Sequence, residues 1–479
     1  MNHPPKKSSR KYWLRAGSAV LAFALATSGS TVATAQSGSS EDGLYESTES
    51  ALKDAAATGS GESLGTSTPD SDFTGFYSSL PEFIDGTPGE IIKSEPTTFA
   101  LGLPFVDWTF SKSTRVAYVS TDAKGRTVPI TGTIMQSSKP WKGKGPRPLM
   151  IVVPGTQGSS NSCAPGKLQP LGMEYESIAV AQALLRGWDV ALTDLHGLGT
   201  KPQHTYMNRE YQARATLDMG HAVKEFGLRG VDDSTPVATW GYSQGGGSSA
   251  AALELAHTYA PDLNVVAGYA GGVPADLSVV ASAIDNGVLA AALGYTINGM
   301  LYANPELEPA IEDKMNDEGK RLLEQTKSEC IPESLLRHAY VDSRTLTKDG
   351  SSLTEFLKQE PFKSAVSEQL IGKRPPKVPV YVGQGTNDDT IPASQARALA
   401  KAWADGGAEV YYQKHPIPKV APLVDHALPM PTHMSPAIEW LEKIINGQDY
   451  PVSAPNEIPA PDGPTPEGGV PLSGVELSS

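Results

Sequence analysis

Short, continuous apolar runs recur along most of the chain, and stretches with a helical pattern of apolar residues separate them. The helical stretches include Tyr175–Arg186, Ala213–Phe226 and Gly246–Tyr259. Strands buried on both faces are apolar throughout, and they alternate with helices where a parallel sheet is covered on both sides. The pattern therefore predicts an α/β fold with a mostly parallel central sheet flanked by helices. The predicted strands are Leu149–Val153, Asp189–Leu192, Val237–Trp240, Val265–Tyr269, Val378–Val382 and Glu409–Tyr412.

Two regions depart from this alternation. Arg115–Ser120 and Ile130–Gln136 follow each other across a turn-like segment, Asp122–Gly125, which predicts an antiparallel pair of strands. From Asp276 to Gly372 the strand-like runs stop and the pattern is mainly helical. We therefore expect an α/β core formed by residues 72–275 and 373–450, with residues 276–372 inserted as a helical cap.

The ends of the chain differ in composition from this body. Residues 36–71 are rich in Ser, Thr, Gly and Glu, and they offer too little apolar surface to offset chain entropy. Residues 451–479 are rich in Pro and Gly. We expect a disordered leader and a flexible tail.

Residues 1–35 have the three-part order of a secretory signal peptide. Five basic residues precede a charge-free apolar run, Ala16–Thr27, and a group of small residues ends at Ala35, directly before Gln36. The run is too short to span a bilayer, which favours a cleaved signal over an uncleaved anchor. We expect cleavage near Ala35–Gln36 and a protein that is secreted or held in the cell envelope.

The net charge of the chain limits the kinds of partner that it can bind. The 479 residues have a formal net charge of −14, and removal of residues 1–35 leaves −19. Such a surface repels nucleic acid and anionic lipid headgroups, so we expect no nucleic-acid partner.

No His-Glu-x-x-His motif is present, and Gly245-Gly246-Gly247 lacks the lysine of a phosphate-binding loop. We therefore expect neither a metal nor a cofactor.

The strongest chemical signal is Gly241-Tyr242-Ser243-Gln244-Gly245, which fits the G-x-S-x-G nucleophile elbow. A predicted strand ends at the motif and a predicted helix begins directly after it. In that context the serine is held in a strained turn at the sheet edge, and glycines on either side leave room for it. Ser243 is therefore the predicted nucleophile of an α/β-hydrolase fold, and the backbone N–H of Gln244 is an expected oxyanion donor.

A serine nucleophile needs a histidine base and an acid, which follow it in this fold in the order acid, then histidine. Asp388 lies on the loop after the strand Val378–Val382, and we select it over its neighbour Asp389. We select His426 as the base. His433 remains the alternative, because both histidines precede the last predicted helix, Ser435–Ile445.

The second oxyanion donor of this fold comes from the loop after an earlier strand. Here that loop is Pro154–Gly158, where the backbone N–H of Thr156 or of Gln157 is the candidate. The alternative is a flexible glycine-containing loop without a catalytic role.

Several segments resemble the secretory lipase family, whose structural type is a yeast lipase A, and we expect a bacterial member. The resemblance covers residues 73–448 and implies esterase or lipase activity, a helical cap, and a disulfide from the Cys-Ala-Pro loop to that cap. His196 departs from it, since an aromatic residue is expected there. The segments that carry it are Tyr118–Asp122, Pro154–Gly158, Ser162–Pro165, Thr193–Thr200 and Gly241–Gly246.

These observations lead to a secreted serine lipase or esterase that hydrolyses carboxylic esters of the acylglycerol type through an acyl-enzyme. The expected partner is an ester or lipid substrate, with transient contact with a lipid interface. An acyltransferase of the cell envelope and a non-catalytic binding module are the alternatives.

Two further expectations concern the predicted cap. Cys163 and Cys330 are the only cysteines, and in an exported chain we expect them to form a disulfide rather than two buried thiols. The alanine-rich stretch Val279–Ala303 is expected to line the acyl-binding tunnel or cover its mouth. Ordinary core packing is the alternative for that stretch.

Overall fold

The computed structural model describes residues 53, 75–78, 80–102 and 110–459. The predicted signal peptide, the predicted leader apart from residue 53, and residues 460–479 of the predicted tail lie outside these residues. No helix within the described part of the chain is long and apolar enough to cross a membrane.

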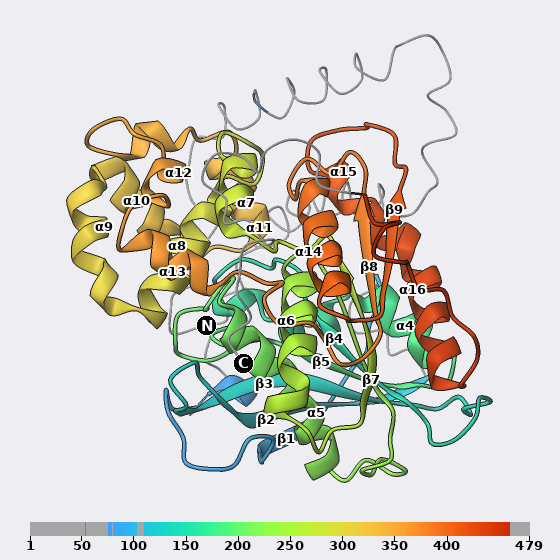
Figure 1. The fold of residues 1–479 in the computed structure, drawn as a ribbon. Helices are drawn as coiled ribbons and strands as arrows, with labels where there is room; N and C mark the ends of the chain where they lie inside the picture. The colour runs from blue at the N-terminus through green and yellow to red at the C-terminus, as the bar shows by residue number, and fades with distance from the viewer. Residues whose placement is uncertain (1–52, 54–74, 79, 103–109, 460–479) are drawn as a thin grey trace, which may run out of the picture.

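Among the described residues, a nine-stranded sheet forms the centre of the molecule (Figure 1). Its order is β1-β2-β3-β5-β4-β6-β7-β8-β9, with antiparallel pairing from β1 to β5 and parallel pairing from β5 to β9. The predicted antiparallel pair and the mostly parallel sheet are confirmed. The strands are β1 (Ile91–Thr97), β2 (Ser111–Thr121), β3 (Thr127–Ser137), β4 (Leu149–Val153), β5 (Asp189–Thr193), β6 (Val237–Tyr242), β7 (Val265–Gly271), β8 (Val380–Gly385) and β9 (Val410–His415).

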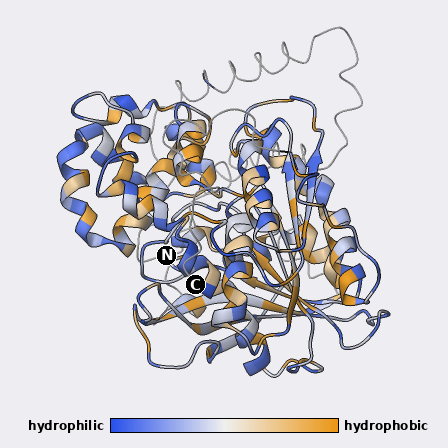
Figure 2. Cartoon of the chain, in the orientation of Figure 1, coloured by the Kyte–Doolittle hydropathy of each residue, from blue (hydrophilic) through white to orange (hydrophobic). Residues whose placement is uncertain are grey.

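Helices cover both faces of the sheet. Along β4, Val152 packs into the apolar cluster on the side of α4 and α16, whereas Ile151 faces the side of α5, because successive side chains of a strand alternate. The apolar residues accordingly gather between sheet and helices (Figure 2). One face carries α4 (Ser177–Leu185) and α16 (Pro429–Ile445), and the other carries α5 (Arg209–Glu225), α6 (Gln244–Tyr259) and α14 (Ala393–Asp405).

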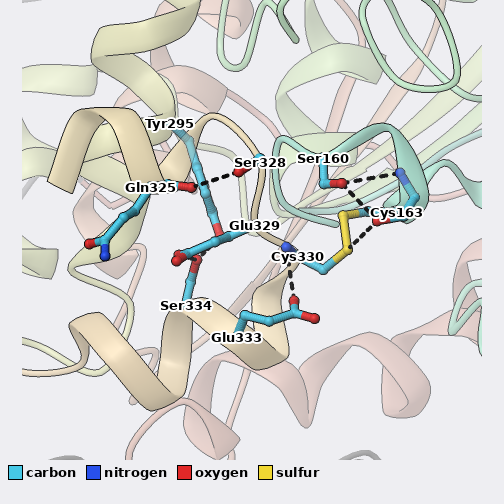
Figure 3. The surroundings of a disulfide bond; sticks show 10 residues. Ser160, Cys163, Tyr295, Gln325, Ser328, Glu329, Cys330, Glu333 and Ser334 are labelled. Carbon is cyan, nitrogen blue, oxygen red and sulfur yellow. Dashed lines mark hydrogen bonds between the residues drawn. A yellow bond between two sulfur atoms is a disulfide. The ribbon is translucent and has the colours of Figure 1, made fainter. Parts of the chain in front are cut away.

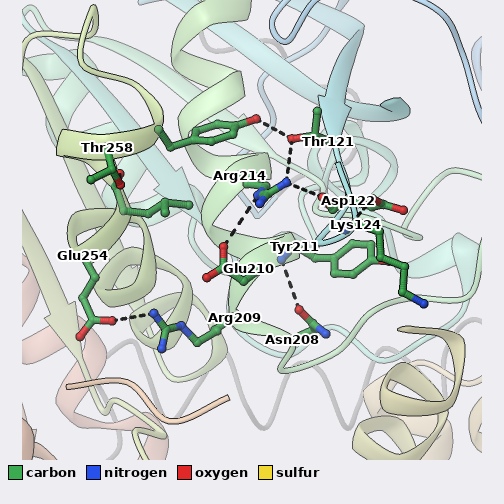
Figure 4. Close-up of polar contacts among 12 residues, drawn as sticks. Thr121, Asp122, Lys124, Asn208, Arg209, Glu210, Tyr211, Arg214, Glu254 and Thr258 are labelled. Carbon is green, nitrogen blue, oxygen red and sulfur yellow. Dashed lines mark hydrogen bonds and ion pairs between the residues drawn. The ribbon is translucent and has the colours of Figure 1, made fainter. Parts of the chain in front are cut away.

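Polar contacts fix α5 between the sheet and its neighbouring helix (Figure 4). Arg209 forms a buried ion pair with Glu254 of α6, with 3.1 Å between Nη2 and Oε2. Arg214 donates to the carbonyl of Asp122, directly after β2, at 2.5 Å. Since α6 follows the predicted nucleophile, these contacts help to hold the edge of the sheet where the site lies.

The chain between β7 and β8 is helical, and its apolar residues form one cluster with Tyr206, Met207 and Ile391 of the core. The two ends of this insertion are neighbours, because the N–H of Ile371 donates to the carbonyl of Ala275 at 3.0 Å. Its helices are α7 (Leu277–Ile284), α8 (Ala291–Ala303), α9 (Glu308–Lys314), α10 (Asp317–Thr326), α11 (Ile331–His338), α12 (Leu353–Phe356) and α13 (Phe362–Glu368), with 3₁₀ turns at Pro305–Leu307 and Ser343–Leu346.

Short elements complete the fold around the strand ends. The connection after β4 contains α3, and the connection after β9 contains α15, so both lie beside the carboxyl ends of parallel strands. These elements are α3 (Pro165–Leu168), α15 (Val424–Ala427) and the 3₁₀ turns Gly75–Tyr77, Asn161–Cys163 and Gln169–Leu171.

Some predicted boundaries were wrong. Helix α5 begins at Arg209 rather than Ala213, because the Asn208 side chain caps it by accepting the N–H of Tyr211. Helix α16 begins at Pro429 rather than Ser435, since a proline is tolerated in a first turn where no N–H partner is needed. His433 therefore lies inside this helix rather than before it.

Candidate active site

The turn around Ser243 joins the end of β6 to the start of α6. Ser243 has φ 58° and ψ −123°, a strained conformation for a residue with a side chain. A Cβ on Gly241 would lie 2.1 Å from the carbonyl oxygen of Gly245, and one on Gly245 would lie 2.2 Å from that of Val153. The turn is therefore closed to any residue but glycine at these two positions, as the motif predicts.

The structure brings Ser243, His426 and Asp388 together. The Nε2 atom of His426 lies 2.8 Å from the hydroxyl oxygen of Ser243. The opposite ring nitrogen, Nδ1, lies 2.8 Å from Oδ2 and 2.9 Å from Oδ1 of Asp388. Nδ1–H donates to the carboxylate, which leaves Nε2 to accept the proton of the serine hydroxyl.

Asp388 is held by its own loop. Its Oδ1 accepts the N–H groups of Thr390 and Ile391, and its Oδ2 accepts the amide N–H of Gln384 at 3.0 Å. The side chain is fully buried. These bonds orient the carboxylate toward His426.

The neighbouring Asp389 has a different position and a different partner. Its Oδ2 accepts the N–H of Leu423 at 2.6 Å, and Leu423 is a left-handed residue with φ 66° directly before α15. Burial raises the pKa of Asp389 to about 6. Asp389 therefore supports the short helix that carries His426, whereas Asp388 contacts the histidine itself.

The environment of His426 sets its basicity. Burial lowers the pKa of this imidazole, but the charge and hydrogen bond of Asp388 more than offset that effect, so its pKa is raised above the usual value. Tyr242, the second residue of the elbow motif, donates from its hydroxyl to the carbonyl of His426 at 2.8 Å. The histidine is thus anchored through its backbone as well as its ring.

His433 lies apart from this arrangement. Its ring packs against that of His415, and burial together with that neighbour lowers its pKa to about 2. His415 in turn contacts the hydroxyl of Tyr381, with Nε2 3.2 Å from Oη. Neither of these two histidines replaces His426 beside Ser243.

The predicted oxyanion groups come from two segments next to the elbow. Gln244 opens α6, where the first N–H groups of a helix have no intrahelical partner. Within the described residues, the N–H groups of Gln244, Thr156 and Gln157 bond to no protein acceptor. Thr156 is fixed by its side chain, whose hydroxyl lies 2.8 Å from that of Tyr206.

An apolar cavity opens beside Ser243, and the empty space between its walls and at its open mouth is about 880 Å³. Most of its wall comes from the helical insertion, and the acid loop contributes Thr390 and Ile391. The insertion residues on its wall include Leu277, Val280, Ala281, Ile284, Leu289, Ala292, Leu293, Thr296, Ile297, Met300, Leu301, Leu307, Ile311, Leu353, Phe356, Leu357, Phe362 and Val366.

A disulfide joins Cys163 to Cys330, as predicted, and links the loop after β4 to the insertion (Figure 3). Backbone pairing reinforces this link. The N–H of Ser159 donates to the carbonyl of Glu329, and the N–H of Ile331 donates to that of Gln157. The loop that carries Thr156 and Gln157 is therefore attached to the insertion on one side.

Sequence reasoning missed several residues that surround the site. Tyr242 was identified only as part of a motif, and Tyr175, Glu176 and Tyr206 carry no local pattern that marks them. Their contacts with the site join residues far apart in sequence.

Among the described residues, no group of three His, Cys, Asp or Glu side chains is placed to bind a metal ion.

Comparisons with known proteins agree on one family. A family model described as secretory lipase matches residues 164–452. A secreted triacylglycerol lipase of Malassezia furfur is 27% identical over 285 residues, covering 58% of this chain and 72% of that protein. A probable inactive lipase of Mycobacterium tuberculosis is 26% identical over 347 residues, covering 71% and 76% respectively.

The fold comparison points the same way. The closed state of Candida antarctica lipase A superimposes with a TM-score of 0.70 at 21% identity, covering 81% of this chain and 90% of that chain. The α/β-hydrolase fold predicted from the elbow is therefore confirmed.

Proposed function

This chain belongs to the secretory lipase family and is a carboxylic ester hydrolase, and from that premise we propose that Ser243, His426 and Asp388 form its catalytic triad. The observation that carries the proposal is the continuous contact from Ser243 Oγ through the His426 ring to Asp388, with 2.8 Å at each step. An ester hydrolase needs this order of nucleophile, base and acid.

In the proposed reaction, Ser243 Oγ attacks the ester carbonyl while Nε2 of His426 accepts the hydroxyl proton. The tetrahedral oxyanion accepts hydrogen bonds from the N–H of Gln244 and from an N–H in the Thr156–Gln157 segment. Collapse of this intermediate breaks the ester C–O bond, and His426 returns the proton to the leaving alcohol. Water then attacks the acyl-enzyme by the same route and releases the acid.

The apolar cavity is the proposed site of the acyl chain. Its wall is apolar apart from a few hydroxyls, and Ser243 itself borders it, so an acyl chain in the cavity has its carbonyl at the nucleophile. This assigns the predicted stretch Val279–Ala303 to substrate binding, with residues 276–372 as a cap over the site. Transient contact with a lipid interface stays a prediction.

One relative is named a probable inactive lipase, so the alternative for this chain is a binding module that keeps the fold. The hydrogen-bonded Ser243, His426 and Asp388 favour turnover, because a binding module has no need of that arrangement.

Labelling with a fluorophosphonate distinguishes an ester hydrolase from a binding module. We expect the wild-type protein to be labelled and to hydrolyse p-nitrophenyl esters, and Ser243→Ala to do neither, with activity lower by several orders of magnitude. Near-normal turnover by Ser243→Ala would contradict the triad.

We also propose that the protein is secreted. The support is the signal-like order of residues 1–35 and the secreted lipases among the relatives. Sequencing the N-terminus of protein from the culture medium tests this, and Gln36 is the expected first residue.

A further inference from the structure

Two adjacent residues, Tyr175 and Glu176, contact the loop after β4 at Gly155, Thr156 and Gln157. Oε1 of Glu176 accepts the N–H of Gly155 at 2.6 Å, and the hydroxyl of Tyr175 donates to the carbonyl of Thr156 at 3.0 Å. The side-chain amide nitrogen of Gln157, Nε2, lies 3.4 Å from the other carboxyl oxygen of Glu176, Oε2. The loop is therefore held by these two residues as well as by the insertion.

The close approach of Tyr175 and Glu176 leaves no space for a side chain at Gly155. A Cβ there would lie 2.5 Å from the hydroxyl of Tyr175 and 3.0 Å from Oε1 of Glu176. The two side chains thus occupy the space beside this glycine, and Glu176 is fully buried. Gly155 allows the loop to pack directly onto them.

The bond to the carbonyl of Thr156 has a consequence on the other side of the same peptide plane. In a trans peptide the C=O and the N–H point in opposite directions. By fixing the carbonyl of Thr156, Tyr175 also fixes the direction of the N–H of Gln157. That N–H has no protein acceptor among the described residues, and it is one of the two candidates for the second oxyanion donor, beside Gln244.

We propose that Tyr175 and Glu176 are positioning residues that aim the Gln157 N–H at the oxyanion, an inference that rests on the proposed ester hydrolysis. Neither side chain lines the apolar cavity beside Ser243. Glu176 orients the peptide before Gly155, and Tyr175 orients the peptide between Thr156 and Gln157, so both peptide planes that flank the turn are fixed.

The charge state of Glu176 is consistent with this role. Burial raises the pKa of its carboxyl well above the usual value, and the neighbouring Glu174 raises it further. The neutral acid is therefore favoured. A neutral group can accept the N–H of Gly155 without placing a negative charge near the developing oxyanion.

The test compares Tyr175→Phe, Glu176→Leu and Glu176→Gln with the wild type. Phe removes only the hydroxyl, and Leu removes the acceptor, whereas Gln keeps a neutral acceptor for Gly155. We expect the first two to lower kcat by about tenfold to a hundredfold with KM nearly unchanged, because a misdirected donor acts on the transition state. Glu176→Gln should retain kcat within about threefold. The matched control is Tyr269→Phe, since the buried hydroxyl of Tyr269 has no partner in the described structure.

Binding of butylboronic acid separates positioning from a merely structural role, because its adduct with Ser243 is tetrahedral. Its inhibition constant should rise in step with the fall in kcat for Tyr175→Phe and Glu176→Leu, after correction for the fraction of folded enzyme. A kcat within about twofold of wild type for both variants would overturn the inference, as would a lower kcat with unchanged boronate binding. Wild-type protein without esterase activity would instead overturn the proposed function, and this inference with it.

Discussion

Ser243 combines a strained backbone with neighbours that leave it no other conformation. A residue in such a region of φ/ψ space costs of the order of 1–3 kcal/mol. Backbone oxygens would lie 2.1 and 2.2 Å from a Cβ on Gly241 and Gly245, which shows how tightly β6, α6 and the end of β4 enclose the turn. The conformation persists because the packed elements determine it, and it presents the hydroxyl to His426.

At the same scale, His426→Ala should abolish ester hydrolysis, whereas His433→Ala should retain most of it. Of these two histidines, His426 contacts both Ser243 and Asp388, whereas His433 packs against His415. Loss of a general base costs several orders of magnitude in kcat/KM, and loss of a packing residue does not. Initial rates on a soluble p-nitrophenyl ester measure the difference.

The pH profile serves as the control for this pair. Protonated His426 cannot accept the proton of Ser243, and the pKa of His426 is raised by Asp388. Activity of the wild type and of His433→Ala should therefore fall together as the pH drops through that raised pKa. An inactive His433→Ala that remains folded, beside an active His426→Ala, would show that the base is His433.

The sequence could select Ser243 and Asp388 as candidates because each stands in a local pattern, an elbow motif and a loop after a strand. It could not separate His426 from His433 on position alone. The separation depends on the route of the chain after β9, where the N–H of Leu423 binds Asp389 and α15 turns His426 toward the serine. Tyr175 and Glu176 were beyond prediction, because their contacts are formed only once the loop and α4 pack together.

Among the elements, the short helix α15 shows how a site residue on an irregular connection is made rigid. Asp389 accepts the N–H of Leu423, the residue directly before α15. Asp425, within the helix, accepts the N–H groups of Val420 and Ala421. Two carboxylates thus hold a four-residue helix that is too short to be stable alone. The sequence predicted the long elements from their apolar periodicity, but α15 has no such pattern.

A charge in the apolar wall of the insertion should change chain-length preference. Leu293 of α8 lines the cavity and is almost fully buried. We expect Leu293→Asp to lower activity on a decanoate ester by about tenfold more than on an acetate ester, because only the long chain must contact the buried charge. A series of p-nitrophenyl esters of increasing chain length measures the ratio.

Leu336→Asp, on the exposed side of α11, is the matched control and should leave the ratio unchanged. An equal loss on both esters with Leu293→Asp would indicate misfolding of the insertion instead of a changed acyl site. Thermal unfolding of each variant identifies that outcome.

At the scale of the whole molecule, the Cys163–Cys330 bond joins the core to the insertion across 167 residues of sequence. We expect the double variant Cys163→Ser/Cys330→Ser to be less stable by about 2–4 kcal/mol, because the unfolded chain gains conformational freedom. Its kcat should fall as well, since residues 157–160 lose a covalent attachment. Thermal unfolding and steady-state kinetics measure the two effects.

Thiol counting of the denatured, unreduced wild type provides the control. No free thiol is expected, and two free thiols would contradict the bond. A double variant with unchanged stability and kcat would show that the backbone pairing of Ser159 and Ile331 is sufficient to hold the loop.

The hydrogen bond between Ala275 and Ile371 bears on how the insertion can change during evolution. The whole insertion leaves and rejoins the core at one point, so descendants can lengthen, shorten or exchange it without shifting the register of β7 against β8. Specificity for the acyl chain can then diverge while the reacting groups stay the same. The constraint on such an exchange is the segment Glu329–Ile331, because a transplanted cap must bring a replacement that pairs with the loop after β4.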